Sequence, residues 1–352
     1  MGDTPRIRVL VVDDSPFMRM AICRTLEPSA AIEVVGQARN GVEALEKAKA
    51  LEPDVITLDV EMPLMGGLEA LKAVMAWHRP IPCVMVSSLT TEGAEITLSA
   101  LDEGAIDFIT KPSSLAGMDI GQMQRDLVDK IVVAAHIPPA RLKGRIGPPK
   151  ARAPLRLGAT AGKRGVEVVC IGISTGGPPA LQRIIPALPV NLPVAVVVAQ
   201  HMPAGFTKSM AERLNRTSAI EVKEAEEGDI ISAGRVLVAK SGMHLVFNEK
   251  YGKKIAHITH RPESESYFPS VNVLFESAAH FFGNRTLPVV MTGMGTDGTE
   301  GLKALKKQGA FAMAQSEESC AVYGMPKSAI EGGLVDRIAG LDDMAGAIIE
   351  EL

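Results

Sequence analysis

The first 135 residues repeat one pattern five times: a short apolar segment followed by a segment with helical spacing. Apolar runs such as Val55–Leu58 have the length of buried strands, and segments such as Gly41–Ala50 place apolar residues on one helix face. Crossover helices between parallel strands produce this alternation, so we expect an α/β fold with a doubly wound, five-stranded sheet. The expected strands are Arg8–Val12, Glu33–Ala38, Val55–Leu58, Cys83–Val86 and Ile106–Thr110; the expected helices are Pro16–Glu27, Gly41–Ala50, Leu68–Trp77, Ile96–Glu103 and Asp119–Ala135.

Polar side chains stand at the carboxyl ends of four of these expected strands. They are Asp13 and Asp14, Asp59, Ser87 and Lys111. In a doubly wound sheet these ends share one edge, where ligands bind. Three carboxylates that converge repel one another unless a cation neutralises them, and a few hard oxygen ligands suit Mg²⁺. A lysine and a hydroxyl beside them would stabilise a phosphoryl group on a carboxylate, so the pattern predicts a phosphoacceptor site.

Residues 137–165 differ in composition from the chain on either side. They hold eight Lys or Arg, five Pro, five Gly and no Asp or Glu, and they show no useful apolar periodicity. We therefore expect a flexible, extended linker between a domain at 1–136 and a domain at 166–352. The positive charge of this linker would let it bind an acidic surface. Alternatively, the linker only keeps the chain soluble.

Charge and hydropathy exclude several classes of protein. The net charge of −4 combines +8 in the linker with −12 elsewhere, which argues against general nucleic-acid binding. No run approaches about 18 apolar residues, and no long apolar segment precedes Asp13. We therefore expect no membrane span, no signal peptide and a cytoplasmic location. Four separated cysteines without a CxxC motif suit buried free thiols in a reducing compartment.

From residue 166 the chain shows a second alternation of strands and helices, interrupted by a β-rich stretch. We expect an α/β domain with a mainly parallel core and with hairpins of short strands in Ile220–Asn248, where glycines recur. The expected core strands are Val166–Ile173, Val194–Ala199, Pro288–Thr292 and Phe311–Ala314; the expected helices are Ala180–Leu188, Phe206–Leu214, Val271–Phe282, Thr299–Gln308 and Leu341–Leu352.

Three reactive side chains follow core strands of this second part. They are Ser174, His201 and Asp297. A serine nucleophile needs a base to take its proton and an acid to hold that base in the right tautomer, and these residues supply the three roles in the chain order Ser–His–Asp. This order differs from that of the α/β-hydrolases, where the acid precedes the histidine. Gly176 and Gly177 permit a tight turn whose N–H groups would bind an oxyanion.

Each of these signals also has a plainer explanation. A Ser-Thr-Gly-Gly turn serves more often as a helix cap or phosphate cradle, which leaves open a nucleotide-binding domain, although no lysine or acidic ribose partner follows in a recognisable motif. Asp297 lies between residues typical of turns and would also suit a helix cap. A phosphorylation-dependent binding module without catalysis is a further alternative. The remaining histidines lack ligand spacing, so we expect no zinc site; those considered are His244, His257, His260 and His280.

The first part resembles the response-regulator receiver family over about residues 6–130. The motifs are VLVVDDS (9–15), TLDVEMPLMGGLEAL (57–71), VMVSS (84–88) and DFITKP (107–112). The resemblance implies that a chemotaxis histidine kinase phosphorylates Asp59, and that Asp13, Asp14, Asp59 and the backbone of Glu61 hold Mg²⁺. It also implies a switch hydroxyl, a switch aromatic and a phosphoryl contact at Ser87, Phe108 and Lys111. The family usually has Asp-Gly where this chain has Gly66-Gly67, which removes no catalytic group.

The second part closely resembles the catalytic domain of the chemotaxis receptor methylesterases, over about residues 166–350. The motifs are IGISTGGPPAL (171–181), VAQHMPAGFT (198–207), FPSVNVLFESAA (268–279) and MTGMGTDGTEGL (291–302). The resemblance implies that Ser174 is the nucleophile, His201 the general base and acid, and Asp297 the orienting carboxylate. Thr175 and Met294 would then adjoin the nucleophile, with the Met294 N–H as an oxyanion donor.

This second resemblance also implies a substrate and a form of regulation. The family hydrolyses glutamyl methyl esters on chemoreceptors to glutamate and methanol, deamidates receptor glutamines, and is blocked by its own unphosphorylated receiver. The enzyme would then reach its membrane-bound receptors as a peripheral protein, with no cofactor in the esterase part. One departure is Asn272, where the family often has Asp. We expect this position to lie away from the triad and to affect packing or regulation.

Overall fold

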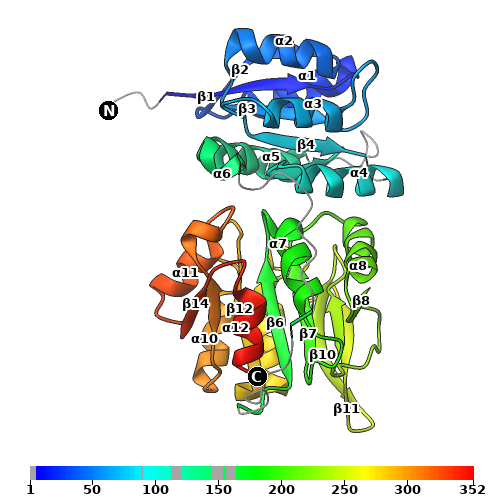
Figure 1. The fold of residues 1–352 in the computed structure, drawn as a ribbon, viewed down its shortest axis with the longest axis vertical. Helices are drawn as coiled ribbons and strands as arrows, with labels where there is room; N and C mark the ends of the chain where they lie inside the picture. The colour runs from blue at the N-terminus through cyan, green and yellow to red at the C-terminus, as the bar shows by residue number, and fades with distance from the viewer. Residues whose placement is uncertain (1–4, 89, 112–119, 144–153, 156–163) are drawn as a thin grey trace. The chain divides into compact units, whose positions relative to one another are not determined.

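The computed structural model describes residues 5–88, 90–111, 120–143, 154–155 and 164–352. The chain divides into two compact units, Met1–Pro148 and Pro149–Leu352 (Figure 1). The segment expected as an extended linker contains a short helix, α6 (Pro139–Lys143), so its first residues are not extended. Within the described ranges, no helix has both the length and the apolar character needed to cross a bilayer.

The first unit contains a five-stranded, fully parallel sheet in the order β2-β1-β3-β4-β5. This topology confirms the doubly wound sheet expected from the sequence. The strands are β1 (Ile7–Val12), β2 (Ile32–Ala38), β3 (Val55–Asp59), β4 (Cys83–Ser87) and β5 (Asp107–Thr110). The helices are α1 (Pro16–Leu26), α2 (Gly41–Leu51), α3 (Gly67–Met75), α4 (Thr91–Asp102) and α5 (Ile120–Ala135).

Helix α4 begins at Thr91, five residues before the start expected at Ile96. Its first turn contains Glu92 and Gly93, which carry no apolar periodicity. The helix is started by a cap instead, because the Thr90 hydroxyl accepts a hydrogen bond from the Gly93 N–H at 2.9 Å. A search for apolar spacing does not detect a turn that is held only by its cap.

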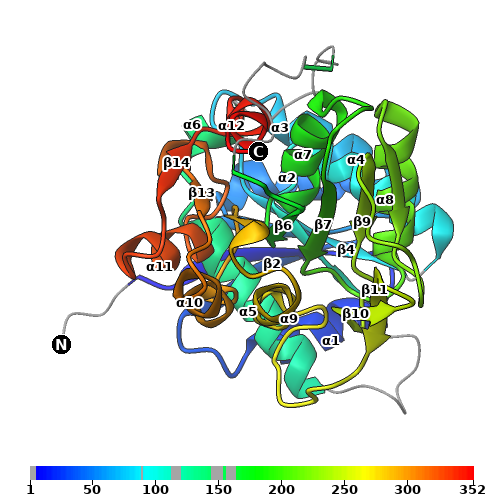
Figure 2. The same ribbon diagram turned by 90° about the horizontal axis from the view of Figure 1, so that it is seen from below.

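The second unit is built on a seven-stranded, fully parallel sheet in the order β14-β13-β12-β6-β7-β9-β8. Figure 2 shows helices α7, α8 and α12 on one face of this sheet and helices α9 and α10 on the other. The strands are β6 (Val168–Ile173), β7 (Ala195–Gln200), β8 (Glu221–Glu224), β9 (Arg235–Val238), β12 (Thr286–Val290), β13 (Met313–Gln315) and β14 (Arg337–Ala339). The helices are α7 (Gly177–Ile184), α8 (Phe206–Thr217), α9 (Val271–Phe281), α10 (Thr299–Lys307), α11 (Met325–Glu331) and α12 (Met344–Glu350), with 3₁₀ turns η2 (Ile185–Ala187), η3 (Gly283–Arg285) and η4 (Glu317–Ser319).

The β-rich stretch differs in part from the expected hairpins. Strands β8 and β9 pair in parallel at the edge of the large sheet, so no hairpin joins them. The antiparallel hairpin lies further along the chain, between β10 (His244–Lys250) and β11 (Lys253–Thr259). Alternation and glycines identify strands but do not distinguish parallel from antiparallel partners, because the pairing depends on contacts distant in sequence. The sequence pattern also gave no expectation for β14 and α11.

The core of the second unit forms where α9 and α10 cover the sheet. Its members include Cys170 of β6, Leu237 of β9, Phe275 of α9 and Leu302 of α10, all at most 1% exposed. The four cysteines are unpaired thiols; three are buried, whereas Cys23 on α1 is half-buried. Burial raises the pKa of Cys83 to about 12 and raises that of Cys170 as well, so these thiols stay protonated and unreactive near neutral pH.

Candidate active site and phosphoacceptor site

Ser174 is the first residue after β6, the strand near the middle of the seven-stranded sheet. Its N–H donates to the Thr292 carbonyl at 2.9 Å, which joins the turn after β6 to the turn after β12. Gly293 allows this approach, since a Cβ atom there would lie 2.7 Å from the Ser174 Cβ. Ser174 is only 9% exposed as a residue, so the two turns enclose most of it.

Gln200, the last residue of β7, connects Ser174 with His201. Its side-chain Nε2 donates to the Ser174 carbonyl and to the His201 carbonyl, each at 2.9 Å. Gly177 makes room for this side chain, because a Cβ atom there would lie 2.0 Å from the Gln200 Oε1. The Gly-Gly turn therefore has a second purpose beyond tight turning: it lets one buried amide hold the backbones of both site residues.

Asp297, in the loop between β12 and α10, faces the N-terminus of α9. The first backbone N–H groups of a helix have no partner within the helix, and here they donate to the Asp297 carboxylate. Its Oδ2 accepts from the Val271 N–H at 2.7 Å, and its Oδ1 accepts from the Asn272 N–H at 2.9 Å and from the Ser270 hydroxyl at 3.1 Å. Asp297 is 7% exposed. The helix terminus thus holds a buried carboxylate in a fixed orientation and supports its negative charge.

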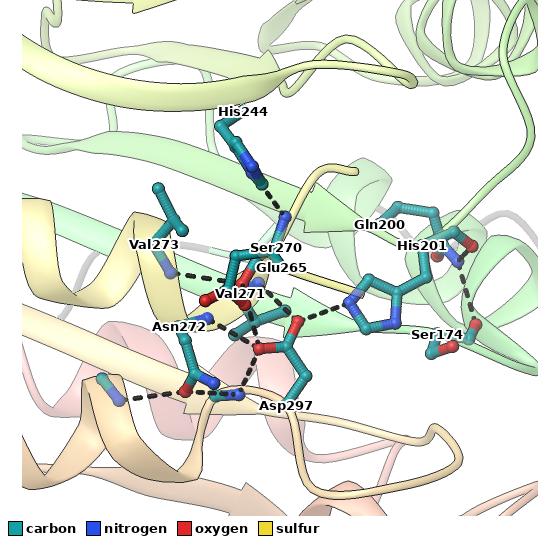
Figure 3. A network of polar contacts seen from close by, with 12 residues as sticks. Ser174, Gln200, His201, His244, Glu265, Ser270, Val271, Asn272, Val273 and Asp297 are labelled. Carbon is teal, nitrogen blue, oxygen red and sulfur yellow. Dashed lines mark hydrogen bonds and ion pairs between the residues drawn. The ribbon is translucent and has the colours of Figure 1, made fainter. Parts of the chain in front are cut away.

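His201 follows β7 and bonds to this carboxylate. The distance from His201 Nε2 to Asp297 Oδ2 is 2.7 Å. Figure 3 shows the imidazole between Asp297 and Ser174, with the second ring nitrogen on the Ser174 side. That nitrogen, Nδ1, is buried and has no hydrogen-bond partner among the described residues. The structure therefore brings together the three residues predicted as a triad, and it leaves one basic nitrogen available beside the serine.

The pKa of Asp297 lies below its ordinary value. Burial alone would raise this pKa, but the hydrogen bond and the charge interaction with His201, together with the N–H groups of Val271 and Asn272, outweigh burial. The carboxylate therefore stays ionised at neutral pH. An ionised Asp297 stabilises positive charge on His201, which a general base acquires when it removes a proton.

The prediction that Asn272 lies away from the triad is wrong. Its N–H donates to Asp297, and its side-chain Oδ1 accepts from the N–H groups of Gly298 and Gly301 at 2.9 and 3.0 Å. Asn272 therefore joins the start of α9 to the start of α10 directly beside the carboxylate. Distance along the chain gave no sign of this contact, because it requires α9 and α10 to pack side by side.

The residues predicted next to the nucleophile lie in the two turns. Thr175 is buried directly after Ser174, and its carbonyl accepts from the Thr292 hydroxyl at 2.9 Å. Met294 is half-buried in the turn after β12, and in the described part of the chain its N–H donates to no protein acceptor. An N–H group without an acceptor beside a nucleophile is available to a developing oxyanion.

The first unit gathers its predicted site residues at the carboxyl edge of its sheet. Asp13, Asp14 and Asp59 place carboxylate oxygens within 4.8 Å of one another, and Lys111 Nζ lies 3.0 Å from Asp13 Oδ2 and 2.7 Å from Asp59 Oδ2. Those two oxygens are buried and lack hydrogen-bond geometry to a donor. Burial is the main cause that raises the pKa of Asp59 to about 6, while the adjacent Lys111 ammonium opposes it. A hard divalent cation fits this set of oxygen ligands.

The other predicted residues of this unit surround that cluster less directly. The Glu61 N–H donates to Asp59 Oδ1 at 3.4 Å. Ser87 is buried and accepts a hydrogen bond from the Thr97 hydroxyl of α4 at 2.7 Å. Phe108 is buried within β5, with the Lys130 ammonium 5.5 Å from its ring centre. The structure describes one arrangement of these residues, so their roles in a switch remain predictions.

Sequence reasoning missed several residues of the active site. Ser270 was detectable in part, since a serine directly before an apolar helix is a typical N-cap, and its hydroxyl accepts from the Val273 N–H. Tyr267 stacks on the His201 ring with centroids 4.2 Å apart and planes 5° apart. Gln200 bonds to the Ser174 carbonyl and His244 bonds to the Ser270 N–H, and both contacts form only when the chain is folded. Nothing in their sequence spacing indicates these contacts.

Fold and site together define a class of protein: a receiver-type α/β unit with an acidic pocket, joined to a parallel α/β unit with a hydrolase-type Ser–His–Asp arrangement. A family model described as CheB methylesterase matches residues 169–348, and a model of the response regulator receiver domain matches residues 9–119. The chain belongs to the CheB methylesterase family and carries a receiver domain.

Relatives and a solved structure agree with this assignment. The protein-glutamate methylesterase/protein-glutamine glutaminase of Halalkalibacterium halodurans is 46% identical over 349 residues, covering 98% of each chain. The protein of the same name from Pyrococcus abyssi is 42% identical over 345 residues, covering 98% of this chain and 93% of the relative. The crystal structure of the Thermotoga maritima CheB methylesterase catalytic domain is 41% identical and covers 53% of this chain and 99% of its own, with a TM-score of 0.52.

Proposed function

We propose that this chain is a phosphorylation-activated serine esterase of chemotaxis signalling that hydrolyses glutamyl methyl esters on receptors to glutamate and methanol. The same acyl transfer would deamidate receptor glutamines, in line with the second activity in the relatives' names. Its substrate receptors lie in the membrane, and the enzyme would reach them from the cytoplasm as a peripheral protein.

The observation that carries this proposal is the contact of His201 with Asp297 at 2.7 Å, on the opposite side of the ring from Ser174 (Figure 3). In the first half of the reaction, the Ser174 hydroxyl attacks the ester carbonyl while His201 Nδ1 takes its proton. His201 returns this proton to the leaving methoxide, so methanol departs and an acyl-enzyme remains. Water then attacks the acyl-enzyme with His201 as base, which releases the glutamate and restores the serine.

The turns on either side of Ser174 would stabilise the negative oxygen of the tetrahedral intermediate. The Met294 N–H is one donor that the described hydrogen bonds leave available, and the backbone N–H of Thr175 adjoins the nucleophile on the other side. Loss of one such donor lowers the rate of a serine protease by about 10²–10³-fold. The close packing at Gly293 fixes the distance between this loop and Ser174.

Regulation would begin at Asp59. A chemotaxis histidine kinase would donate the phosphoryl group, and Lys111 is positioned to contact it. A Mg²⁺ ion held by Asp13, Asp14, Asp59 and the Glu61 backbone would neutralise charge on the transferring group when bound. The added phosphoryl charge would bias Ser87 and Phe108 toward a second arrangement and relieve a block on the esterase.

Methanol release from methylated receptor membranes tests the proposal. Wild-type chain should release methanol, and Ser174→Ala should release none above the level without enzyme. Thermal unfolding of both proteins would show that the variant keeps its fold. No release by the wild type, even with a phosphodonor such as acetyl phosphate, would favour the alternative of a binding module without catalysis.

A further inference from the structure

His244, in strand β10, is completely buried, and each of its ring nitrogens takes part in one hydrogen bond. Its Nε2 lies 3.1 Å from the Pro262 carbonyl oxygen, and its Nδ1 lies 3.1 Å from the Ser270 backbone nitrogen, which donates to it. Phe268 packs against the ring at 4.4 Å between centroids. One side chain thus fastens both ends of the segment 262–270 to the hairpin.

These two contacts specify one protonation state. A carbonyl oxygen only accepts, so Nε2 must carry the proton; a backbone N–H only donates, so Nδ1 must be unprotonated. The neutral Nε2–H tautomer satisfies both contacts. The other neutral tautomer satisfies neither, and the doubly protonated ring sets Nδ1–H against the Ser270 N–H.

The segment that His244 fastens touches two of the three proposed catalytic residues. Near its middle, Tyr267 stacks in parallel on the His201 imidazole. At its end, the Ser270 hydroxyl lies 3.1 Å from Asp297 Oδ1, and Ser270 is the cap of the helix whose first N–H groups hold Asp297 (Figure 3). A shift of this segment would therefore move the surroundings of both the base and the carboxylate.

We propose that His244 is a positioning residue of the esterase site: as the neutral Nε2–H tautomer it clamps segment 262–270, and this clamp sets the orientation of His201 and Asp297. The two hydrogen bonds of its ring go to Pro262 and Ser270 and not to the serine nucleophile. The inference rests on the catalytic roles proposed above for His201 and Asp297.

The surroundings of His244 favour the neutral ring. Burial is the largest cause that lowers its pKa, and the charge of His260 acts in the same direction. The Pro262 carbonyl and the carboxylates of Glu265 and Asp297 act in the opposite direction but do not outweigh burial. The clamp should therefore be intact at neutral pH and be weakened in acid, when a proton is forced onto Nδ1.

Nuclear magnetic resonance of the full chain with ¹⁵N-labelled histidine tests the tautomer without any activity measurement. Two-bond correlations from the ring protons distinguish a protonated from an unprotonated nitrogen, and the signal absent from His244→Asn assigns the residue. We expect a protonated Nε2 and an unprotonated Nδ1 at pH 7.5. A doubly protonated ring or the Nδ1–H tautomer at this pH would overturn the proposal.

Kinetics on two variants then test the clamp. Asparagine carries its acceptor near the position of Nδ1, so His244→Asn keeps a partner for Ser270, whereas His244→Gln keeps only a donor for Pro262. We expect kcat for methanol release to fall about 10²-fold in His244→Gln and by a smaller factor in His244→Asn, with KM changed less than about twofold, because displacement of catalytic groups affects the chemical step. His257→Gln is the matched control, since His257 is a half-buried histidine on the adjacent strand β11 whose ring contacts Glu227.

The outcomes separate this inference from the proposed function. If the wild type releases methanol, Ser174→Ala does not, and both His244 variants retain the wild-type kcat, the clamp is refuted while the esterase stands. The clamp is also refuted if kcat falls to the same extent in His244→Asn and His244→Gln and if both variants are equally destabilised in thermal unfolding. The loss of activity would then follow from a weakened fold. Absence of methanol release by the wild type would refute the proposed function instead, and the tautomer result would stand by itself.

Discussion

His201 turns its Nε2 toward Asp297, 2.7 Å from Oδ2, and keeps its Nδ1 for the side on which Ser174 lies (Figure 3). In trypsin-like serine proteases the two ring nitrogens have the opposite assignment. The chemistry requires only that one nitrogen bonds the acid and the other faces the nucleophile. The ring orientation here follows from the position of Asp297 at the start of α9, where Val271 and Asn272 donate their backbone N–H groups to it.

Replacement of Asp297 by asparagine should nearly abolish the esterase. An amide has only one oxygen acceptor, and its NH₂ group would face the N–H donors that now surround the carboxylate. We expect kcat to fall by about 10³-fold or more, as when the acid of another triad is neutralised. Methanol release from methylated receptors measures this, and Asp229→Asn, an acidic residue whose partners lie outside the site, is the control. A loss below tenfold would mean that Asp297 does not orient the base.

The stacking of Tyr267 on His201 should depend on the aromatic face and not on the hydroxyl. Tyr267→Phe keeps the ring, so kcat should stay within about twofold of the wild type. Tyr267→Leu removes the flat surface that holds the imidazole plane, and we expect kcat to fall about tenfold. Steady-state methanol release from the same receptor membranes compares the two. Equal rates for the phenylalanine and leucine variants would exclude a role for stacking.

Replacement of Asn272 should destabilise the protein more than replacement of most residues on a helix surface. Asn272→Ala leaves the Gly301 N–H without its acceptor and leaves the Gly298 N–H with Asp297 Oδ1 alone, which should lower the free energy of unfolding by about 1–2 kcal/mol. Asn272→Asp keeps an acceptor for both groups and should lose less than the alanine variant. Chemical denaturation measures the free energy of unfolding of each variant, and hydrogen exchange of α10 shows whether the loss is local to this helix. An alanine variant as stable as the wild type would contradict this account.

The second unit should lose stability in mild acid because of His244. Its pKa is lowered in the folded state from an ordinary value of 6.5, so the unfolded chain binds the proton first as the pH falls. The contribution is fully present above about pH 6.5, and it is lost as the pH falls toward the folded-state pKa. Hydrogen exchange of β10 and α9 between pH 7.5 and pH 5 should show this loss, and His244→Asn should show a smaller pH dependence. The same slope in both proteins would assign it to another group.

Phosphodonor activation should require Asp59. Acetyl phosphate with Mg²⁺ should increase methanol release by the wild type, and Asp59→Asn should show no such increase. Lys111→Ala should reduce the increase, because this lysine lies 2.7 Å from the Asp59 carboxylate. Each rate is compared with and without the donor in the same preparation. An increase in Asp59→Asn equal to that of the wild type would place the phosphoacceptor elsewhere.

Much of the fold was predictable because the two halves repeat apolar strands and amphipathic helices. The short β14 and α11 were not, since a segment of three residues such as Arg337–Ala339 is too short to show a period and forms a strand by pairing with β13. Strands β8 and β9 were identified as β structure but misread as a hairpin. Their parallel pairing depends on β9 lying beside β7, which local alternation does not indicate.

The sequence by itself indicated which residues we propose carry the chemistry, because Ser174, His201 and Asp297 each follow a strand of a parallel sheet and such ends share an edge. Only the tertiary structure decided how these groups are held. The N-terminus of α9 receives Asp297, Asn272 joins two helices beside it, and His244 fastens the segment that stacks on His201. These contacts join residues that are distant in sequence, and they are made by backbone N–H groups and by the faces of rings. The spacing of residue types along the chain does not indicate such contacts.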